Sequence, residues 1–208
     1  MLRAFYPILL VALVSACSSL PRQAEHLANA PSCCTSASQF KFEEMQKGRE
    51  SSAPISETST AFSFPTGKSY FVAYDLPSPD HTNPELMVKT YWAATKFEKP
   101  QVFCPSLTFY DASFREISTE LLMLSYLRVE ENGGGYWRSS VPIPPEARHV
   151  AVHTESRRIG NLLAVSTGET APPLLILTPT FVYFDRGGPG QAQFQCGHIG
   201  NVTLTVTP

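Results

Sequence analysis

The sequence predicts an all-β domain, either a plain β-sandwich or a jelly-roll-like one, with a short N-terminal helix. Charged residues make up only 16% of the chain, and there are 18 prolines. Apolar and polar residues alternate in several short runs, which is the pattern of half-buried strands. Glycine and proline stand between these runs, as they do between the strands of sandwiches. Few charges with many β-branched and aromatic residues fit the same class.

The first sixteen residues have the layout of a secretory signal peptide. Arg3 precedes an apolar run over residues 7–14, which is too short to span a membrane. Val14-Ser15-Ala16-Cys17 is similar to a lipobox, where processing cuts before the cysteine and acylates its thiol. We therefore expect Cys17 to open the mature chain and carry lipid. The alternative is a plain signal peptide followed by an incidental cysteine.

The mature chain is predicted to have two parts. Residues 17–32 are polar with little periodicity, so they are expected to form a lipidated tether. Residues 33–208 have the length of one ordinary domain. Within it, the stretch Cys33–Lys47 is the predicted helix, and the serine-rich stretch Gly48–Thr60 is predicted to be an irregular loop.

Strands are predicted wherever apolar residues alternate or follow a turn. Asn132 and the three glycines after it predict a hairpin between the fourth and fifth of these strands, although the fourth also fits a helix. Pro105 interrupts the third and predicts an edge or a bulge there. The predicted strands are Ser69–Leu76, Leu86–Trp92, Val102–Tyr110, Leu121–Val129, Tyr136–Ile143, Ala147–Thr154, Leu174–Leu177, Phe181–Phe184 and Val202–Thr207.

Four cysteines remain besides Cys17, namely Cys33, Cys34, Cys104 and Cys196. Export places them in an oxidising compartment, so we expect them to pair, in one of three connectivities. The Cα atoms of neighbouring residues are about 3.8 Å apart, which is below the usual disulfide range. We therefore predict that Cys33 and Cys34 each pair with a distant partner. A metal site is the alternative, but adjacent cysteines are poor joint ligands and no Cys-x-x-Cys or histidine cluster supports one. No metal and no cofactor are predicted.

Four stretches together resemble the MalM family, the periplasmic protein of the maltose operon. They are Pro31–Cys34, Gly67–Pro77, Phe103–Asp111 and Arg148–Glu155. The resemblance implies an exported protein associated with a carbohydrate regulon, and it supplies no catalytic residues. The chain departs from the pattern by carrying Cys104 inside the third stretch, so no disulfide arrangement is carried over.

Several sequence features mimic catalytic motifs without meeting their requirements. Thr66-Gly67-Lys68-Ser69 resembles the end of a phosphate-binding loop, but Phe62 stands where that loop needs glycine and a strand follows instead of a helix. His149 and His153 share a strand face, yet four residues of strand separate them by roughly 13 Å, too far to share a metal. No Gly-x-Ser-x-Gly or Ser-x-x-Lys motif is present. We predict that the protein is not an enzyme.

Two tyrosine–tryptophan pairs are candidate saccharide contacts. Adjacent strand residues point to opposite faces, so one member of each pair faces away from the core. Alternation places Trp92 and Trp137 inward, and Tyr91 and Tyr136 outward, where each phenol ring offers a stacking platform. Arg138 would add a hydrogen-bond donor. The alternative is that these aromatic residues only stabilise the core.

These observations predict a lipid-anchored, non-enzymatic accessory protein of the envelope that takes part in maltose- or maltodextrin-type carbohydrate uptake. Ser18 rather than aspartate follows Cys17, which resembles lipoproteins sorted to the outer membrane of Gram-negative bacteria. The expected partners are the membrane, an oligosaccharide and other envelope proteins. A formal net charge of −2 and the lack of a basic run argue against nucleic acid. The rival interpretation is a structural or adaptor lipoprotein that binds proteins through sheet edges or proline-rich loops.

Overall fold

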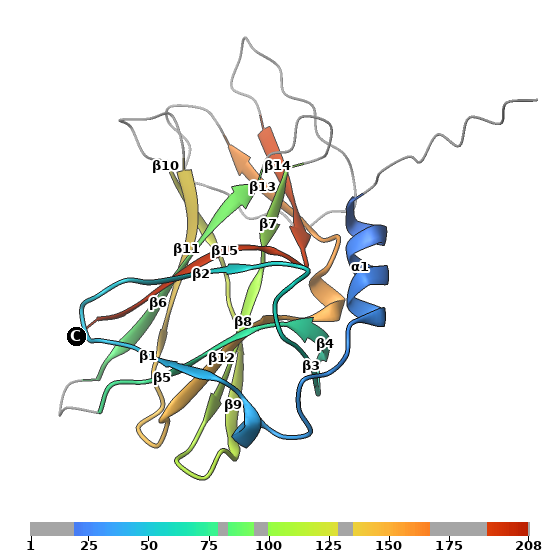
Figure 1. Cartoon of the computed structure of the whole chain (residues 1–208). Helices are drawn as coiled ribbons and strands as arrows, with labels where there is room; N and C mark the ends of the chain where they lie inside the picture. Colours follow the sequence, from blue (N-terminus) through green and yellow to red (C-terminus); the bar gives the residue numbers. More distant parts are fainter. Residues whose placement is uncertain (1–18, 79–82, 94–99, 129–134, 167–190, 208) are drawn as a thin grey trace, which may run out of the picture.

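A computed structural model describes residues 19–78, 83–93, 100–128, 135–166 and 191–207. These residues form a β-sandwich of two main sheets with a short N-terminal helix, which confirms the predicted fold class (Figure 1). The predicted signal peptide, the lipidation site Cys17 and the expected strands Leu174–Leu177 and Phe181–Phe184 lie outside the described residues.

The smaller of the two main sheets has five strands in the order β1-β5-β12-β8-β9. Strands β1 and β5 are parallel, and the other neighbours are antiparallel. The strands are β1 (Phe42–Glu44), β5 (Val72–Asp75), β12 (His149–Thr154), β8 (Pro105–Tyr110) and β9 (Glu116–Leu121).

The larger sheet has eight strands, and β6 lies at its centre. The main path runs β10-β11-β6-β7-β14-β13, while β15 pairs with both β6 and β2. Antiparallel pairing of β10 with β11 confirms the predicted hairpin. The strands are β10 (Ser125–Arg128), β11 (Gly135–Pro142), β6 (Glu85–Ala93), β7 (Gln101–Phe103), β14 (Gln191–Gly197), β13 (Leu162–Ser166), β15 (Gly200–Thr207) and β2 (Ser51–Ile55).

Three predicted stretches differ because the chain changes sheet or direction within them. Residues 69–76 are divided at Phe71 between β5 and β4 (Gly67–Tyr70), and β4 forms a separate hairpin with β3 (Ala61–Phe64). Residues 102–110 are divided at Cys104, where the chain passes from β7 in the larger sheet to β8 in the smaller one. The predicted strand over residues 121–129 begins only at Ser125.

The predicted loop over residues 48–60 contains β2, which was missed because its Ser-Ser-Ala-Pro-Ile sequence has little strand character.

The main core lies between the two sheets. In β6, Leu86, Val88 and Thr90 are fully buried while Tyr91 is exposed, which confirms the predicted alternation. Trp137 is 1% exposed, so its predicted inward orientation is also confirmed.

A second, aromatic cluster covers the outer face of the smaller sheet. Ala73, Tyr110 and Ala151 alternate with residues of the main core, so they point to the opposite face. The chain over residues 34–41 and the β3–β4 hairpin lie over this face and complete the cluster, whose buried aromatic members are Phe40, Phe64, Phe71 and Tyr110.

The N-terminal helix lies earlier in the chain than predicted. Helix α1 spans Ser19–Asn29, within the expected tether, whereas residues 33–47 contain only the 3-10 turn η1 (Ala37–Gln39) and β1. Gln23 and Leu27 are one helical turn apart and both are buried. Leu20, Ala24 and Leu27 recur at helical spacing, a pattern that the expectation of a polar tether overlooked.

The predicted disulfide connectivity is wrong. Cys104 bonds to Cys196, with Cα atoms 5.4 Å apart, and Cys33 bonds to Cys34. The first pair is brought together by the parallel pairing of β14 with β7. In this register Cys196 lies opposite Val102, which is two residues before Cys104 in the chain. Both of these cysteines are buried in the main core, whereas Cys33 is exposed on the outer side of the smaller sheet. Among the cysteines that the structure describes, each of Cys33 and Cys34 therefore has only the other within reach.

Candidate functional site

The outward face of the larger sheet brings together residues from four neighbouring strands, β11, β6, β15 and β2. Their registers place Arg138, Lys89, Thr203 and Ser52 in one row across the strands. In the next row, Asn201 lies opposite Tyr91 on one side and Pro54 on the other. Polar and aromatic side chains thus share a face that alternation directs away from the core.

The predicted platform residues are neighbours on this face. The ring centroids of Tyr91 and Tyr136 are 6.1 Å apart, with an angle of 49° between the ring planes. Tyr91 is 37% exposed, and Tyr136 is half-buried. Lys89 Nζ lies 5.4 Å from the centroid of the Tyr136 ring, a cation–π distance. Tyr91 is therefore the more available of the two rings.

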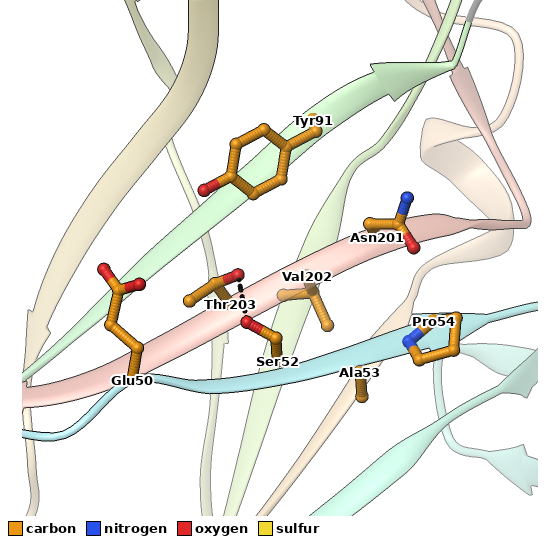
Figure 2. Close-up of a pocket in the computed structure, with 8 residues that line it drawn as sticks. All are labelled: Glu50, Ser52, Ala53, Pro54, Tyr91, Asn201, Val202 and Thr203. Carbon is orange, nitrogen blue, oxygen red and sulfur yellow. Dashed lines mark hydrogen bonds between the residues drawn. The ribbon is translucent and has the colours of Figure 1, made fainter.

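A shallow groove of about 300 Å³ lies beside Tyr91 (Figure 2). Strand β15 forms its floor, and side chains from β6 and from the β2 segment form its two walls, as Figure 2 shows. The lining residues are Glu50, Ser52, Ala53, Pro54, Tyr91, Asn201, Val202 and Thr203.

Hydroxyl and amide groups supply the groove with hydrogen-bonding capacity. The hydroxyls of Ser52 and Thr203 lie 2.8 Å apart and hydrogen-bond to each other, which fixes both side chains. Asn201 is exposed, and its carboxamide offers two donors and an acceptor. An apolar ring wall facing hydroxyl and amide groups is suited to a ligand that has one apolar face and a polar rim.

An ion pair joins the two walls. Lys89 Nζ, on β6, donates a hydrogen bond to Oε1 of Glu50, the residue immediately before β2, over a distance of 2.5 Å. This hydrogen bond is the main reason that the pKa of Lys89 is raised, and the charge of Glu50 acts in the same direction against the burial of Lys89. The charges of Lys89 and Glu50 therefore neutralise each other, while the exposed Arg138 lies one strand further from the groove, opposite Lys89.

The sequence predicted part of this site. Tyr91 is exposed and Tyr136 lies beside it, as expected, and Arg138 is exposed in the row that contains Lys89. The side chain of Trp92 lies outside the described residues. Sequence reasoning missed Lys89, Glu50, Ser52, Asn201 and Thr203. Alternation alone would have placed Lys89 on the same face as Tyr91. The pairing of β15 with β6 and with β2, which brings in the other four residues, leaves no local signal in the sequence.

The predicted separation of the two histidines is also seen. His149 Nδ1 lies 2.6 Å from Asp75 Oδ1, while His153 is buried, stacks on the Phe64 ring and contacts the Thr108 hydroxyl at 2.8 Å. Within the described ranges, no group of three or more His, Cys, Asp or Glu side chains is arranged to hold a metal ion.

The stretch that mimics a phosphate-binding loop is the turn of the β3–β4 hairpin. Gly67 has a φ of +120°, and a Cβ atom there would lie 2.0 Å from Ser156 Oγ. Glycine is therefore required by the turn and by the close approach of Ser156, and a strand follows it.

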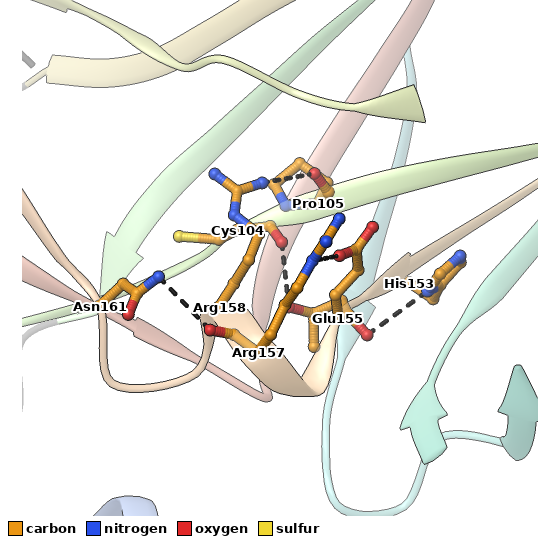
Figure 3. A network of polar contacts seen from close by, with 8 residues as sticks. Cys104, Pro105, His153, Glu155, Arg157, Arg158 and Asn161 are labelled. Carbon is orange, nitrogen blue, oxygen red and sulfur yellow. Dashed lines mark hydrogen bonds and ion pairs between the residues drawn. The ribbon is translucent and has the colours of Figure 1, made fainter. Parts of the chain in front are cut away.

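A second polar cluster surrounds the point where the chain changes sheet (Figure 3). Thr154 Oγ1 donates to the Cys104 carbonyl at 3.0 Å, and Arg158 donates to the Pro105 carbonyl at 3.1 Å. The buried Glu155 carboxylate accepts a hydrogen bond from Arg157. These bonds hold the 3-10 turn η2 (Ser156–Arg158) against the crossover, so we assign this cluster a structural role.

Comparison with models of known protein families, with curated proteins and with solved structures gives no match. None of the helices in the described part of the chain is long and apolar enough to cross a bilayer.

Proposed function

We propose that this chain is a non-enzymatic, saccharide-binding accessory protein of the cell envelope, attached to the membrane by lipid on Cys17. The observation that carries the proposal is the exposed Tyr91 ring beside a polar groove on an open sheet face. In this arrangement the apolar face of one sugar ring packs on Tyr91. The sugar hydroxyls bind Asn201, Ser52 and Thr203, which lie across the groove.

The size and charge of the groove indicate the class of saccharide. A volume of about 300 Å³ is at the lower end of small-molecule sites, so it suits one or two sugar rings of a longer chain that extends into solvent. Among the residues that line the groove only Glu50 is charged, and it is paired with Lys89, so the groove itself offers no unpaired charge to an anionic sugar. A neutral glucan of the maltodextrin type fits these properties.

The location and the regulon are supported by the sequence. The lipobox-like stretch ending at Cys17 supports a lipid anchor, and Ser18 after it supports a periplasm-facing site at the outer membrane. The MalM-like stretches support an association with carbohydrate handling.

Calorimetric titration of the mature protein with a panel of oligosaccharides tests the proposal. We expect weak binding of a neutral glucan, a loss of at least tenfold in Tyr91→Ala, and near-normal binding in Tyr91→Phe, which keeps the ring. Tyr136→Ala should weaken binding less, because Lys89 already lies over that ring. Met123→Ala is the matched control, since it removes an exposed apolar side chain that does not line the groove. Absence of binding by every oligosaccharide at millimolar concentration would contradict the proposal.

One observation favours a second candidate function, that of an adaptor for other envelope proteins. Three of the large apolar side chains that are exposed in the described residues, Ile117, Leu121 and Met123, lie on or directly after β9. Strand β9 is at the end of the five-stranded order, and edge strands with exposed apolar groups pair with other chains. Photo-crosslinking in cells from position 123, compared with position 91, distinguishes the two functions: a single protein captured at position 123 supports the adaptor.

A further inference from the structure

Helix α1 is attached to the domain by specific contacts in its second turn. Gln23 Nε2 donates to Gln101 Oε1 at 3.0 Å, and Gln23 Oε1 accepts the backbone N–H of His198 at 3.3 Å. One turn later, Leu27 is buried in the main core. Gln23 is only 5% exposed, so these amide hydrogen bonds are shielded from water.

The C-terminal end of α1 is held as well. Lys68 Nζ, from β4, donates to the carbonyls of Ala28 and Ala30, where the helix leaves carbonyl groups without partners inside it. The backbone N–H of Cys33 then donates to the Ala61 carbonyl at 2.9 Å. The chain from Gln23 to Cys33 is thus fixed to the domain at four points, and Figure 1 shows α1 standing alongside the sandwich.

Very little chain remains between α1 and the lipidation site. Cys17 and Ser19 are two residues apart, so their Cα atoms are at most about 7 Å from each other. From Ser19 to Gln23 the helix advances only about 6 Å. A free tether over residues 17–32 would instead reach roughly 50 Å when extended.

We propose that α1 holds the folded domain directly against the bilayer, with the Ser19 end of the helix facing the lipid headgroups. This inference rests on the proposed lipidation of Cys17. It assigns the partner as a phospholipid surface and restricts the orientation of the domain, because the anchor and the first contact of the domain are within about 13 Å of each other.

Trypsin digestion of the full-length protein in its native membranes tests the docking of α1. Arg22 is the only lysine or arginine between Cys17 and Lys41, and cleavage after it separates the anchor from the domain. With α1 docked, release of a fragment that begins at Gln23, identified by mass spectrometry, should be at least tenfold slower than in Gln23→Ala/Leu27→Ala. Lys68→Met is the milder variant, which leaves the main core intact and should also accelerate release. Equal rates in all three proteins would overturn the docking.

Energy transfer from the tryptophans to a dansyl-labelled phospholipid tests proximity to the membrane. The comparison is with a variant that carries fifteen Gly and Ser residues between Ser18 and Ser19. We expect transfer efficiency to fall at least twofold in this variant, and equal transfer would overturn the inference. Full-length protein that does not sediment with membranes before protease treatment would overturn the lipid anchor itself. Sedimenting protein that is cut rapidly at Arg22 would overturn only the docked helix.

Discussion

The two outward faces of the sandwich both carry aromatic side chains, but they use them differently. On the smaller sheet, phenylalanine rings from residues 34–41 and from the β3–β4 hairpin pack over the strands and exclude water. On the larger sheet, Tyr91 and Tyr136 lie beside a groove, and Tyr91 remains exposed. The outer face of the smaller sheet, the covered face, consists mainly of rings without hydroxyl groups. The outer face of the larger sheet, the open face, presents phenols among polar groups.

The difference shows that aromatic content alone does not identify a binding face. The ring centroid of Phe40 lies 4.8 Å from that of Phe62 and 4.4 Å from that of Phe71, so the rings of this cluster pack mainly on one another. Tyr91 has one neighbouring ring at 6.1 Å and keeps a free side. Substitutions on the covered side should therefore change stability, while those on the open side should change binding.

The largest expected effect concerns the disulfide behind the open face. Cys104→Ala/Cys196→Ala removes a link between residues 92 positions apart, which should lower the free energy of unfolding by about 4–5 kcal/mol if loop entropy dominates. Cys33→Ala/Cys34→Ala opens a link between adjacent residues and should cost only about 1 kcal/mol on the same reasoning. Urea unfolding of the two double variants measures the contrast, and equal losses would show that the covering segment depends on its disulfide.

The next effect concerns the centre of the covered cluster. Phe40→Ala should lower the free energy of unfolding by about 3–5 kcal/mol, because it empties a site surrounded by rings. Ser38→Ala, an exposed change two residues away, is the control and should have an effect below about 0.5 kcal/mol. A loss below about 1 kcal/mol in Phe40→Ala, measured by thermal or urea unfolding, would mean that the cover contributes little to the fold.

A pH effect of similar size is expected at His153, beneath Phe64. Burial lowers the pKa of His153 to about 4, although the Thr154 carbonyl and Glu155 act in the opposite direction. The folded state binds this proton less readily than the unfolded state does. The contribution of neutral His153 to the free energy of unfolding is therefore complete above about pH 6.5, and it is lost as the pH falls toward 4. At about 1.4 kcal/mol per pKa unit, the loss is about 3 kcal/mol. In His153→Gln, unfolding curves should lose this dependence, whereas His26→Gln, an exposed change, should retain it.

The smallest expected effect is on the open face. Tyr91→Ala should change the free energy of unfolding by less than about 1 kcal/mol, because the ring has few packing partners to lose. Trp137→Ala, on the inner side of the neighbouring strand, should cost about 3–5 kcal/mol. Thermal melts of both variants make the comparison, and a large loss in Tyr91→Ala would assign the open face a structural role.

Local patterns in the sequence were sufficient for the sandwich, the β10–β11 hairpin and the outward orientation of Tyr91. They were insufficient wherever an element depends on a distant partner. Strand β2 contains two serines and a proline, and it is a strand because β15, about 150 residues later, pairs with it. Helix α1 is attached to the domain by hydrogen bonds to Gln101, His198 and Lys68 in addition to the burial of Leu27.

The same limit applies to the candidate site and the cysteines. Tyr91 and Lys89 could be assigned to one face from alternation, but Glu50, Ser52 and Asn201 join them only through sheet pairing. The cysteine connectivity was mispredicted because a pair of adjacent cysteines was excluded on its short Cα–Cα distance. The register between β7 and β14, which brings Cys104 to Cys196, could not be known from the sequence.

The position of β15 has a consequence for the order of folding. This strand comes last among the described strands, yet it lies between β6 and β2 and pairs with both, contributing Val202, Leu204 and Val206 to the main core. A chain that is still being synthesised contains β2 and β6 but lacks the strand that joins them. The larger sheet can therefore be completed only after residues 200–207 have left the ribosome, because its central pairings join segments that are far apart in the sequence.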